Sequence, residues 1–354
     1  MPSYLGAIGT AVPSHRLAQP IIAGFMARAL ELDAADTRKL RALYRVSGIE
    51  HRHSVLPDYG REPGAFEFFP NTPGLEPFPA VAPRLAVYRH EALPLALEAV
   101  RAALVQAPGI VAESLTHLIT VSCTGMYAPG LDIELVQALA LDPSVRRTCV
   151  NFMGCYAAVN ALRLADSAVR ADPAARVLVV SVELCTLHFQ KSPEPDHLVS
   201  NALFGDGAAA CLVTGEPLPG QPSLALRAFH CGLEPAGLQD MAWHIGDFGF
   251  EMTLSGYVPA LIERGIGALV ARLLHELPVQ AHDIRHYALH PGGRRILEAI
   301  EHALGLSAHD NRHAYQVLRE LLASVTTADA GAPVLSCAFG PGLTLEAMLL
   351  EVVA

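Results

Sequence analysis

The amino-acid sequence predicts a layered α/β fold, and three observations support this class. Of the 354 residues, 51% are hydrophobic and 17% are charged, which is enough apolar material for the core of one large domain or two fused domains. Segments rich in Val and Leu, such as 175–182, predict strands, whereas alanine-rich amphipathic segments, such as 90–105, predict helices. Because the two kinds of segment alternate along the chain, we expect sheets that are covered by helices.

Composition also narrows the class of partner and the location. The net charge is −10 and no basic cluster appears, which argues against nucleic acid as the main partner, because binding to a phosphate backbone needs a concentrated Lys/Arg surface. Seven cysteines without a Cys-x-x-Cys pair fit reduced thiols in a cytoplasmic protein, and the sequence contains no zinc motif. Residues 1–6 predict a first strand rather than a signal peptide, and no apolar run reaches membrane-spanning length. We therefore expect a cytoplasmic protein without a metal site and without a membrane partner.

The most informative single position is Cys155. It follows an apolar segment and a glycine, and it precedes an alanine-rich helix, in the run VNFMGCYAAVNALR at 150–163. Gly154 allows a sharp turn, so we expect Cys155 at the first turn of a buried helix, where unpaired N–H groups and the helix dipole favour a thiolate. The alternative is a packed core cysteine, since free cysteine is among the most buried residue types.

His290 is the candidate partner of this cysteine. The run HYALHPGGRRIL at 286–297 predicts a strand that ends at His290, a Pro-Gly-Gly turn and a helix. The alternative is a structural histidine, which is the usual role of a lone histidine in a strand. A third run, SCAFGPGLTLE at 336–346, predicts a glycine-rich turn that permits close approach of the backbone to a ligand.

Together with GAIGTAVP at 6–13 and ALFGDGAAA at 202–210, these motifs resemble the chalcone synthase-like type III polyketide synthases over essentially the whole chain. The resemblance implies the thiolase fold, in which two similar α/β halves pack in a layered α-β-α-β-α arrangement, and it implies a homodimer. We place the halves at 1–218, with the cysteine, and 219–354, with the histidine, because a Pro/Gly-rich segment at 215–222 interrupts the pattern. The longest irregular stretch, 57–83, predicts a folded surface loop, with a lid over a tunnel as the alternative.

The resemblance also implies the chemistry. Cys155 would take an acyl group from an acyl-CoA thioester, and His290 would support the thiolate and hydrogen-bond the substrate carbonyl. A malonyl-CoA extender would then lose carbon dioxide and attack the bound acyl group in a Claisen condensation. Coenzyme A thioesters would be substrates, no cofactor would be tightly bound, and an acyl carrier protein is an alternative acyl donor.

One part of the family's machinery is missing from this sequence. The family carries an asparagine about thirty residues after the histidine, where this chain has 321–325, LLASV, within a segment much shorter than the family's. Asn311 is the nearest asparagine, but it precedes a helix predicted at 312–322 and is an unsuitable substitute. Loss of one oxyanion donor costs about a hundredfold to a thousandfold in rate, so we expect decarboxylative extension to be impaired. Two alternatives follow: a non-decarboxylating acyltransferase to an amine, alcohol or carbon nucleophile, and a non-catalytic partner subunit of an active paralogue.

The remaining site residues carry over from the family one by one. Phe204 matches an aromatic gatekeeper, with a core phenylalanine as the alternative, and Met252 or Phe250 matches the second gatekeeper. Cys123, Cys185 and His188 occupy positions of cavity threonines, and Ala128 replaces a methionine that reaches into the neighbouring subunit, which suggests more room. The expected substrate pocket consists of Phe204, Met252, Phe250, Cys123, Cys185, His188, Ala128, Gly340 and Pro341. The expected coenzyme A contacts, each with a solvated helix face or a helix start as its alternative, are Lys39, Arg41, Arg45, Arg294 and Arg295.

Overall fold

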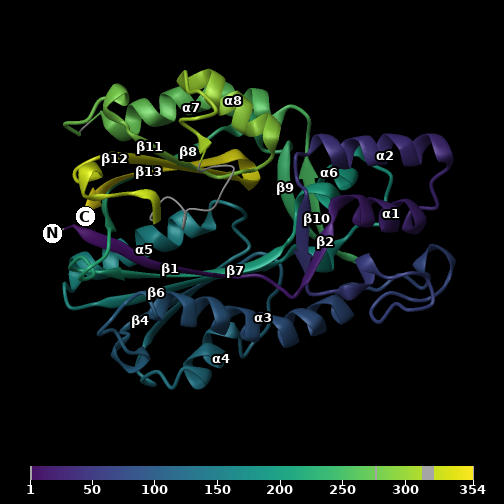
Figure 1. The fold of residues 1–354 in the computed structure, drawn as a ribbon, viewed down its shortest axis with the longest axis horizontal. Coiled ribbons are helices and arrows are strands. Elements are labelled where there is room, and N and C mark those ends of the chain that lie inside the picture. The colour runs from purple at the N-terminus through teal and green to yellow at the C-terminus, as the bar shows by residue number, and fades with distance from the viewer. Residues whose placement is uncertain (1, 276, 313–322, 354) are drawn as a thin grey trace.

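The computed structural model describes residues 2–275, 277–312 and 323–353, and these form five layers (Figure 1). Helices α7 (Val258–Leu274) and α8 (Arg294–Leu304) cover one sheet, helix α5 (Ala157–Ala171) lies in the middle, and helices α3 (Val81–Leu104) and α4 (Leu131–Ala138) cover the other sheet. The order is therefore α-β-α-β-α, which confirms the expected fold class.

The N-terminal sheet has five strands in the order β5-β4-β6-β7-β1. Strands β5, β4 and β6 are parallel to one another, whereas β7 is antiparallel to both β6 and β1. Their bounds are β1 Ser3–Ala11, β4 His117–Ser122, β5 Arg146–Asn151, β6 Arg176–Leu184 and β7 Asp206–Thr214.

The C-terminal sheet repeats this pattern with one strand fewer, in the order β11-β12-β13-β8. Strand β11 is parallel to β12, and β13 is antiparallel to β12 and β8, so these four strands correspond to β4, β6, β7 and β1. No strand occurs in the described residues 305–312 and 323–332, so within the described chain β5 has no counterpart. The bounds are β8 Ser223–Leu233, β11 His286–Leu289, β12 Pro333–Gly340 and β13 Thr344–Val353.

A short ladder joins the two sheets into one continuous hydrogen-bonded sheet of nine strands, and the central helix also connects them. Residues 3–5 of β1 pair with 224–226 of β8, and the segment 215–222 connects β7 to β8. From α5, Arg163 forms an ion pair with Glu346 of β13, and Asn160 donates a hydrogen bond of 3.3 Å to the same carboxylate. Because Glu346 is only 1% exposed, this pairing ties the cysteine-bearing helix to the C-terminal sheet.

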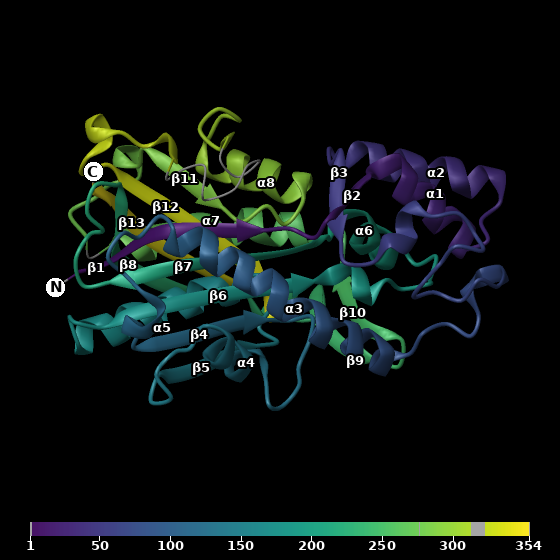
Figure 2. The ribbon, with the colours of Figure 1, turned by 60° about the horizontal axis from the view of Figure 1, so that its bottom comes forward.

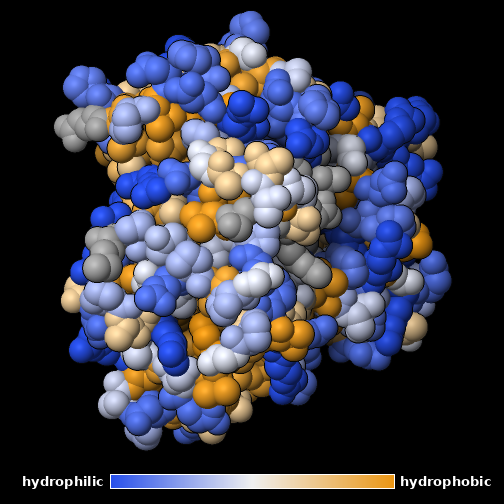
Figure 3. All heavy atoms as spheres, turned by 60° about the vertical axis from the view of Figure 1, so that its left-hand side comes forward, coloured by the Kyte–Doolittle hydropathy of each residue, from blue (hydrophilic) through white to orange (hydrophobic). Residues whose placement is uncertain are grey.

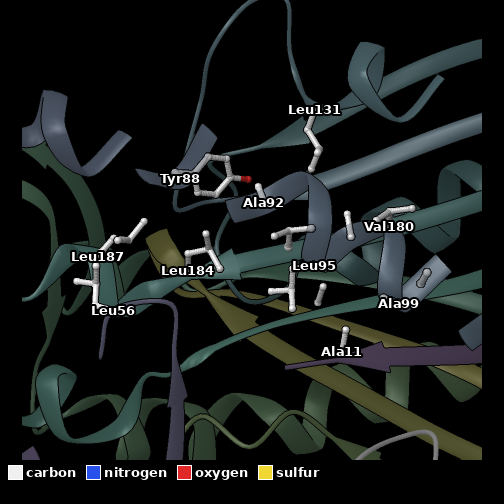
Figure 4. Close-up of a cluster of buried hydrophobic side chains, with 14 of the residues drawn as sticks. Ala11, Leu56, Tyr88, Ala92, Leu95, Ala99, Leu131, Val180, Leu184 and Leu187 are labelled. Atoms are coloured by element: carbon white, nitrogen blue, oxygen red, sulfur yellow. The ribbon is translucent and has the colours of Figure 1, made fainter. Parts of the chain in front are cut away.

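The helix α3 is the longest that the structure describes, and its inner face is lined by alanines. Ala92, Ala96 and Ala99 have no exposed surface, and their small side chains let the helix approach the sheet closely. Figure 4 shows Ala92 and Ala99 gathered with Val180 and Leu184 of β6 in this core. The helix begins at Val81, inside the stretch for which the sequence predicts a loop to residue 83.

A smaller region extends from one end of the two sheets (Figure 2). It contains α1 (Gln19–Ala29), α2 (Ala34–Val46), α6 (Pro195–Leu203), the hairpin β2 (His15–Ala18) and β3 (His51–Ser54), and the hairpin β9 (Met241–Gly246) and β10 (Gly249–Leu254). All of these elements except α2 contribute residues to the lining of the narrow cavity described below.

The loop at 57–80 is packed rather than free. The buried Asp58 carboxylate accepts hydrogen bonds of 2.8–2.9 Å from the backbone N–H groups of Glu67, Phe68 and Phe69. Phe69 and Tyr59 in turn pack against Phe25 of α1, with ring centroids 5.6 and 4.8 Å away. The loop is therefore held as a folded element, as the first of the two sequence interpretations expects.

The side of the molecule that Figure 3 brings forward has no single apolar face among its described residues. On the side that comes forward in Figure 3, hydrophobic side chains form separate groups among hydrophilic ones. Among the described residues, no helix has the length and apolar character needed to cross a membrane. The same residues contain no cluster of His, Cys, Asp and Glu suited to hold a metal ion.

Candidate active site

Cys155 lies in a sharp turn between β5 and α5. After β5 ends at Asn151, Phe152 has a φ of 61° and Gly154 a φ of 83°, so the chain reverses within four residues. The helix begins at Ala157, so Cys155 precedes its first turn instead of lying within it, and the Ala157 N–H bonds to Gly154 O across the turn. Cys155 is therefore held in the turn itself, half-buried and just before the helix N-terminus.

The glycine-rich turn after β12 packs directly on this elbow. A Cβ atom on Gly154 would lie 2.2 Å from Cδ of Pro341, and one on Gly340 would lie 2.4 Å from the Tyr156 ring and 3.3 Å from the Cys155 nitrogen. Both contacts are too short for any side chain, so both positions need glycine. The two motifs, 185 residues apart in the sequence, thus form one site.

The same strand positions His290. The His290 N–H donates a 2.8 Å hydrogen bond to the carbonyl of Cys337, three residues before Gly340 on β12. Within the described residues, the imidazole makes no hydrogen bond, either to Cys155 or to another group. Burial lowers the pKa of His290 to about 4, so the ring is neutral at pH 7. A neutral ring can accept a proton at one nitrogen and donate from the other.

The sequence analysis expects a thiolate at Cys155, but the pKa of this thiol is raised instead. Burial, together with the nearby negative charge of Glu183, raises the pKa of Cys155 to about 12. The free-energy cost of desolvating a buried thiolate is therefore larger than the stabilisation that the helix N-terminus gives it. Cys155 is a protonated thiol at neutral pH. Attack on a thioester consequently requires that its proton be removed.

Glu183 is a site residue that the sequence prediction missed. It lies on β6 and accepts hydrogen bonds from the Cys123 N–H at 2.8 Å and from the Thr124 hydroxyl at 2.6 Å. The Cys123 sulfur in turn accepts a 3.0 Å hydrogen bond from the N–H of Gly154, next to Cys155. Burial raises the pKa of Glu183 to about 7. The sequence does contain a signal for this residue, because Glu183 is the one charged residue in the strand-like run VLVVSVEL at 177–184.

A narrow cavity adjoins the site. It is walled by α1, α6, β3, β10 and the segment after β6, and its open space is about 40 Å³, room for only a few water molecules. Cys185 lines this cavity, and its thiol is close enough to Cys155 for the two to interact electrostatically, although burial and nearby carboxylates are the larger causes of its raised pKa. The predicted pocket residues found in this lining are Phe204, Phe250, Met252, Cys185 and His188.

Aromatic side chains pack against one another in the lining of this cavity. His188 stacks on Phe250 with ring centroids 4.2 Å apart, its Nε2 lies 2.7 Å from the Thr124 carbonyl, and its Nδ1 accepts a 3.0 Å bond from the Phe250 N–H. Burial lowers the pKa of His188 to about 4, so its ring is neutral at pH 7 and lines the cavity as an uncharged group. Trp243 from β9 packs edge-on against both rings, and its indole N–H donates a 2.9 Å bond to Cys123 O. Trp243 was also missed from the sequence, although it is the chain's single tryptophan.

The other predicted residues lie apart from this cavity. Ala128 lines a separate hollow of about 290 Å³ between β4, α4 and β5. Lys39 on α2 is exposed and pairs with Asp36 at 2.8 Å, and Arg294 at the start of α8 pairs with Glu298 at 2.8 Å. Arg41 and Arg45 are exposed on α2, and Arg295 is exposed on α8.

The structure gives Asn311 a structural position. It is fully buried, and its amide donates a 2.9 Å hydrogen bond to Glu301, near the end of α8 that is remote from His290. The predicted helix at 312–322 lies almost wholly outside the described residues. In the N-terminal half, strand β5 leads into the turn that holds Cys155. A strand equivalent to β5 in the C-terminal half would therefore end at the site, and it is this strand that has no counterpart in the described chain. Within the described chain, no second polar residue is presented in that way.

Comparison with known proteins is consistent along the chain. The N-terminal domain of the chalcone and stilbene synthases matches residues 2–217, and the C-terminal domain of the same family matches residues 232–328. The alpha-pyrone synthesis polyketide synthase-like Pks18 of Mycobacterium tuberculosis is 30% identical over 344 residues, covering 92% of this chain and 85% of that protein. The 1,3,6,8-tetrahydroxynaphthalene synthase of Streptomyces peucetius is 30% identical over 365 residues, covering 98% and 92%.

Solved structures give the same result. A polyketide synthase, PKS-I, from the brown alga Ectocarpus siliculosus superposes with a TM-score of 0.90 at 28% identity, over 99% of this chain and 98% of that one. The C-terminal type III polyketide synthase domain of Steely1, a type I/III hybrid from Dictyostelium, superposes with a TM-score of 0.88 at 26% identity over both full chains.

Proposed function

Because the chain belongs to the chalcone and stilbene synthase family and its relatives are type III polyketide synthases, we propose that it transfers acyl groups from coenzyme A thioesters through Cys155. The observation that carries the proposal is the elbow at Cys155, which is locked from the C-terminal half by the turn at Gly340 and Pro341. A cysteine presented in this way is suited to covalent catalysis.

The loading step follows from the protonation states. Cys155 begins as a thiol, and His290 begins as a neutral imidazole without a hydrogen-bond partner among the described residues. When a thioester enters, His290 accepts the proton from Cys155 as the sulfur attacks the carbonyl carbon. The bond from that carbon to the coenzyme A sulfur breaks, and the proton passes to the leaving thiolate. The products are an acyl-Cys155 thioester and free coenzyme A.

The acyl group should be short. Trp243, His188 and Phe250 line the narrow cavity near the site, and its open space of about 40 Å³ is far below the roughly 300–1,000 Å³ of typical ligand sites. The extra room expected from Ala128 concerns the neighbouring subunit's cavity, and in its own subunit Ala128 lines a separate hollow.

A slow extension with malonyl-CoA is the second half of the proposal. Loss of carbon dioxide generates an enolate, and a neutral His290 supplies one N–H to its oxygen. The described chain places no asparagine beside His290, and Asn311 is committed to Glu301. We expect extension to be about a hundredfold to a thousandfold slower than with both donors. The same observation favours the second candidate, a transferase to an amine, alcohol or carbon nucleophile that needs no decarboxylation.

We also propose that the protein is a homodimer. Strand β5 is an edge strand whose first four residues are exposed, and Leu164 on the adjacent α5 is 43% exposed. An open edge beside an exposed apolar side chain favours pairing with a second copy. The separate hollow that contains Ala128 borders the same edge strand, which would place that residue at the interface.

Intact-mass analysis tests the proposal directly. The purified protein is incubated with acetyl-, butyryl-, hexanoyl- and decanoyl-CoA, each with and without malonyl-CoA, and both protein mass and released products are recorded. Cys155→Ala should abolish acylation, whereas Cys149→Ala, which removes an exposed thiol, should leave it unchanged.

The outcomes separate the candidates. Acylation at Cys155 with malonyl-dependent release of carbon dioxide and a pyrone supports the synthase. Acylation that malonyl-CoA leaves unchanged supports the transferase to another nucleophile. If no thioester acylates Cys155, the enzyme proposal is wrong and the non-catalytic partner subunit is favoured.

A further inference from the structure

Two polar groups in the lining of the narrow cavity have no hydrogen-bond partner. His197 and Ser200 lie three positions apart on α6, so they share one face of the helix, and both line the cavity. His197 Nδ1 and Ser200 Oγ are buried, and neither forms a hydrogen bond within the described chain. Buried polar atoms without partners destabilise a fold, so their presence in a cavity wall points to a bound ligand that satisfies them.

Arg52 of β3 adds an unpaired positive charge to the same lining. It is only 7% exposed, and it forms no ion pair with any described residue. Its Nε donates a 2.9 Å hydrogen bond to Gln19 Oε1 and its Nη1 donates one to Phe204 O, whereas Nη2 has no hydrogen-bond partner in the described chain. Asp206, on whose carboxylate Arg52 acts electrostatically, is hydrogen-bonded to Thr186 instead. A buried guanidinium without a counter-ion favours the binding of an anion.

These three side chains lie close together on one wall. The Phe204 carbonyl accepts the bond from Arg52, and the Phe204 N–H bonds to Ser200 O, so Arg52 is held about one helical turn from Ser200. Other polar side chains of the lining are hydrogen-bonded within the protein, namely Ser54, Tyr59, Thr186, Gln190 and Asn201. The described lining contains no Asp, Glu or Lys, so Arg52 is its one permanent charge. We call Arg52, His197 and Ser200 the polar patch.

The chemistry of the polar patch selects a small anion. Water would satisfy the hydroxyl and the imidazole, but only an anion also neutralises the guanidinium. The open space of about 40 Å³ has room for a few water molecules, which suits the two oxygens of a carboxylate. Cys185 lines the same cavity and interacts electrostatically with Cys155, so a ligand that reaches the polar patch shares this space with the surroundings of the nucleophile.

We infer that the polar patch binds the carboxylate at the far end of a short acyl chain, so that the preferred acyl donors are monothioesters of dicarboxylic acids. Arg52 Nη2 and Ser200 Oγ donate hydrogen bonds to the carboxylate, and His197 donates one from Nδ1 when that nitrogen carries the proton. The acyl chain is thereby anchored at one end while its thioester carbonyl is attacked by Cys155. This inference rests on the proposed acyl transfer to Cys155.

The competing ligand is a phosphate of coenzyme A, which offers the same sign of charge. A phosphate enters only together with the pantetheine chain or the nucleotide attached to it, and these need more open space than the cavity has. Donors with and without the acyl carboxylate, and with and without phosphate, separate the two ligands.

Paired acyl donors provide the test. Loading of Cys155 is followed by intact mass with glutaryl-CoA, with glutaramyl-CoA, in which a neutral amide of the same shape replaces the carboxylate, and with the N-acetylcysteamine thioesters of both acyl groups. The variants are Arg52→Gln, which removes the charge, and His197→Ala/Ser200→Ala, which leaves the hydrogen bonds of Arg52 in place. Arg101→Gln, at an exposed arginine on α3, is the control.

Binding is measured independently of acylation. Trp243 is the single tryptophan of the chain and lines the cavity, so its fluorescence reports on ligands there. The Kd values of glutaryl-CoA and glutaramyl-CoA are measured for Cys155→Ala, alone and combined with His197→Ala/Ser200→Ala.

The inference predicts a preference that follows the acyl carboxylate. The second-order rate constant for loading of the wild-type protein should be about tenfold to a hundredfold higher for glutaryl than for glutaramyl donors, whether the carrier is coenzyme A or N-acetylcysteamine. Arg52→Gln and the double variant should lose most of this preference, and Arg101→Gln should keep it. Should Arg52→Gln fail to fold, the double variant decides.

Three results would overturn the inference. They are equal loading and equal affinity for the two acyl groups, a preference that survives in the double variant, and an Arg52→Gln defect that is the same for both acyl groups and confined to coenzyme A donors. The last result would assign Arg52 to a phosphate. If no donor loads Cys155 while Cys155→Ala still binds glutaryl-CoA more tightly, the proposed function is wrong and the carboxylate site stands.

Discussion

Glu183 makes the stability of this protein depend on pH in a direction opposite to that of a salt-bridged carboxylate. Its pKa is about 7 in the folded protein and 4.5 in the absence of perturbation, because burial disfavours its charged form. Folding therefore carries no penalty from this group below pH 4.5. The penalty grows as pH rises and is complete above pH 7.

The magnitude follows from the difference between the two pKa values. A difference of about 2.5 corresponds to about 3 kcal/mol of unfolding free energy, of which about 2.5 kcal/mol should be lost between pH 5 and pH 8.5. Asp206, whose pKa burial raises to about 6, adds a penalty in the same direction, so a single protein measured at two pH values cannot isolate Glu183. A variant that lacks only the Glu183 charge is needed.

Glu183→Gln is that variant, and urea unfolding is the assay. Unfolding free energies are measured at pH 5 and pH 8.5 for the wild-type protein, for Glu183→Gln and for Glu98→Gln, which makes the same change at an exposed site on α3. The wild-type protein and Glu98→Gln should lose about 2.5 kcal/mol more than Glu183→Gln over this range. Because the Glu183 charge also opposes ionisation of Cys155, Glu183→Gln should speed alkylation of Cys155 by iodoacetamide at pH 9. Equal losses in all three proteins would refute the assignment.

Three further predictions follow from the site and its surroundings. Gly340→Ala places a methyl group 2.4 Å from the Tyr156 ring, so thermal unfolding should show a loss of about 1–3 kcal/mol and intact mass should show no acylation. Retention of normal loading by this variant would contradict the locked elbow. Trp243→Ala should enlarge the cavity. In steady-state kinetics, the ratio of kcat/KM for decanoyl-CoA to kcat/KM for butyryl-CoA should rise by about tenfold. An unchanged ratio would show that the tryptophan does not limit acyl length. Leu164→Asp should convert the proposed dimer into a monomer in light scattering, while Val105→Asp, on an apolar residue exposed at the end of α3, should leave that dimer intact.

The sequence alone determined the fold class and the two candidate catalytic positions. Segments with the hydrophobic pattern of strands alternate along the chain with segments that have the pattern of helices. The layered architecture could therefore be predicted before any contact was known. The elbow at Cys155 and the turn at Gly340 were also readable, because glycines mark places where the backbone bends sharply or packs closely. These features are local, and a local pattern predicts them.

Only the tertiary structure decided how the site behaves. Glu183 reaches Cys123 and Thr124 across 60 and 59 positions, and Trp243 reaches Cys123 across 120, so neither partner could be inferred from neighbouring residues. The pKa of Cys155 was predicted to favour the thiolate, and it is raised instead, because the balance between a helix terminus and desolvation depends on how deeply the folded chain buries the sulfur. The size of the cavity could not be predicted from the sequence either, because it depends on which distant rings meet, and here His188, Phe250 and Trp243 meet in its lining.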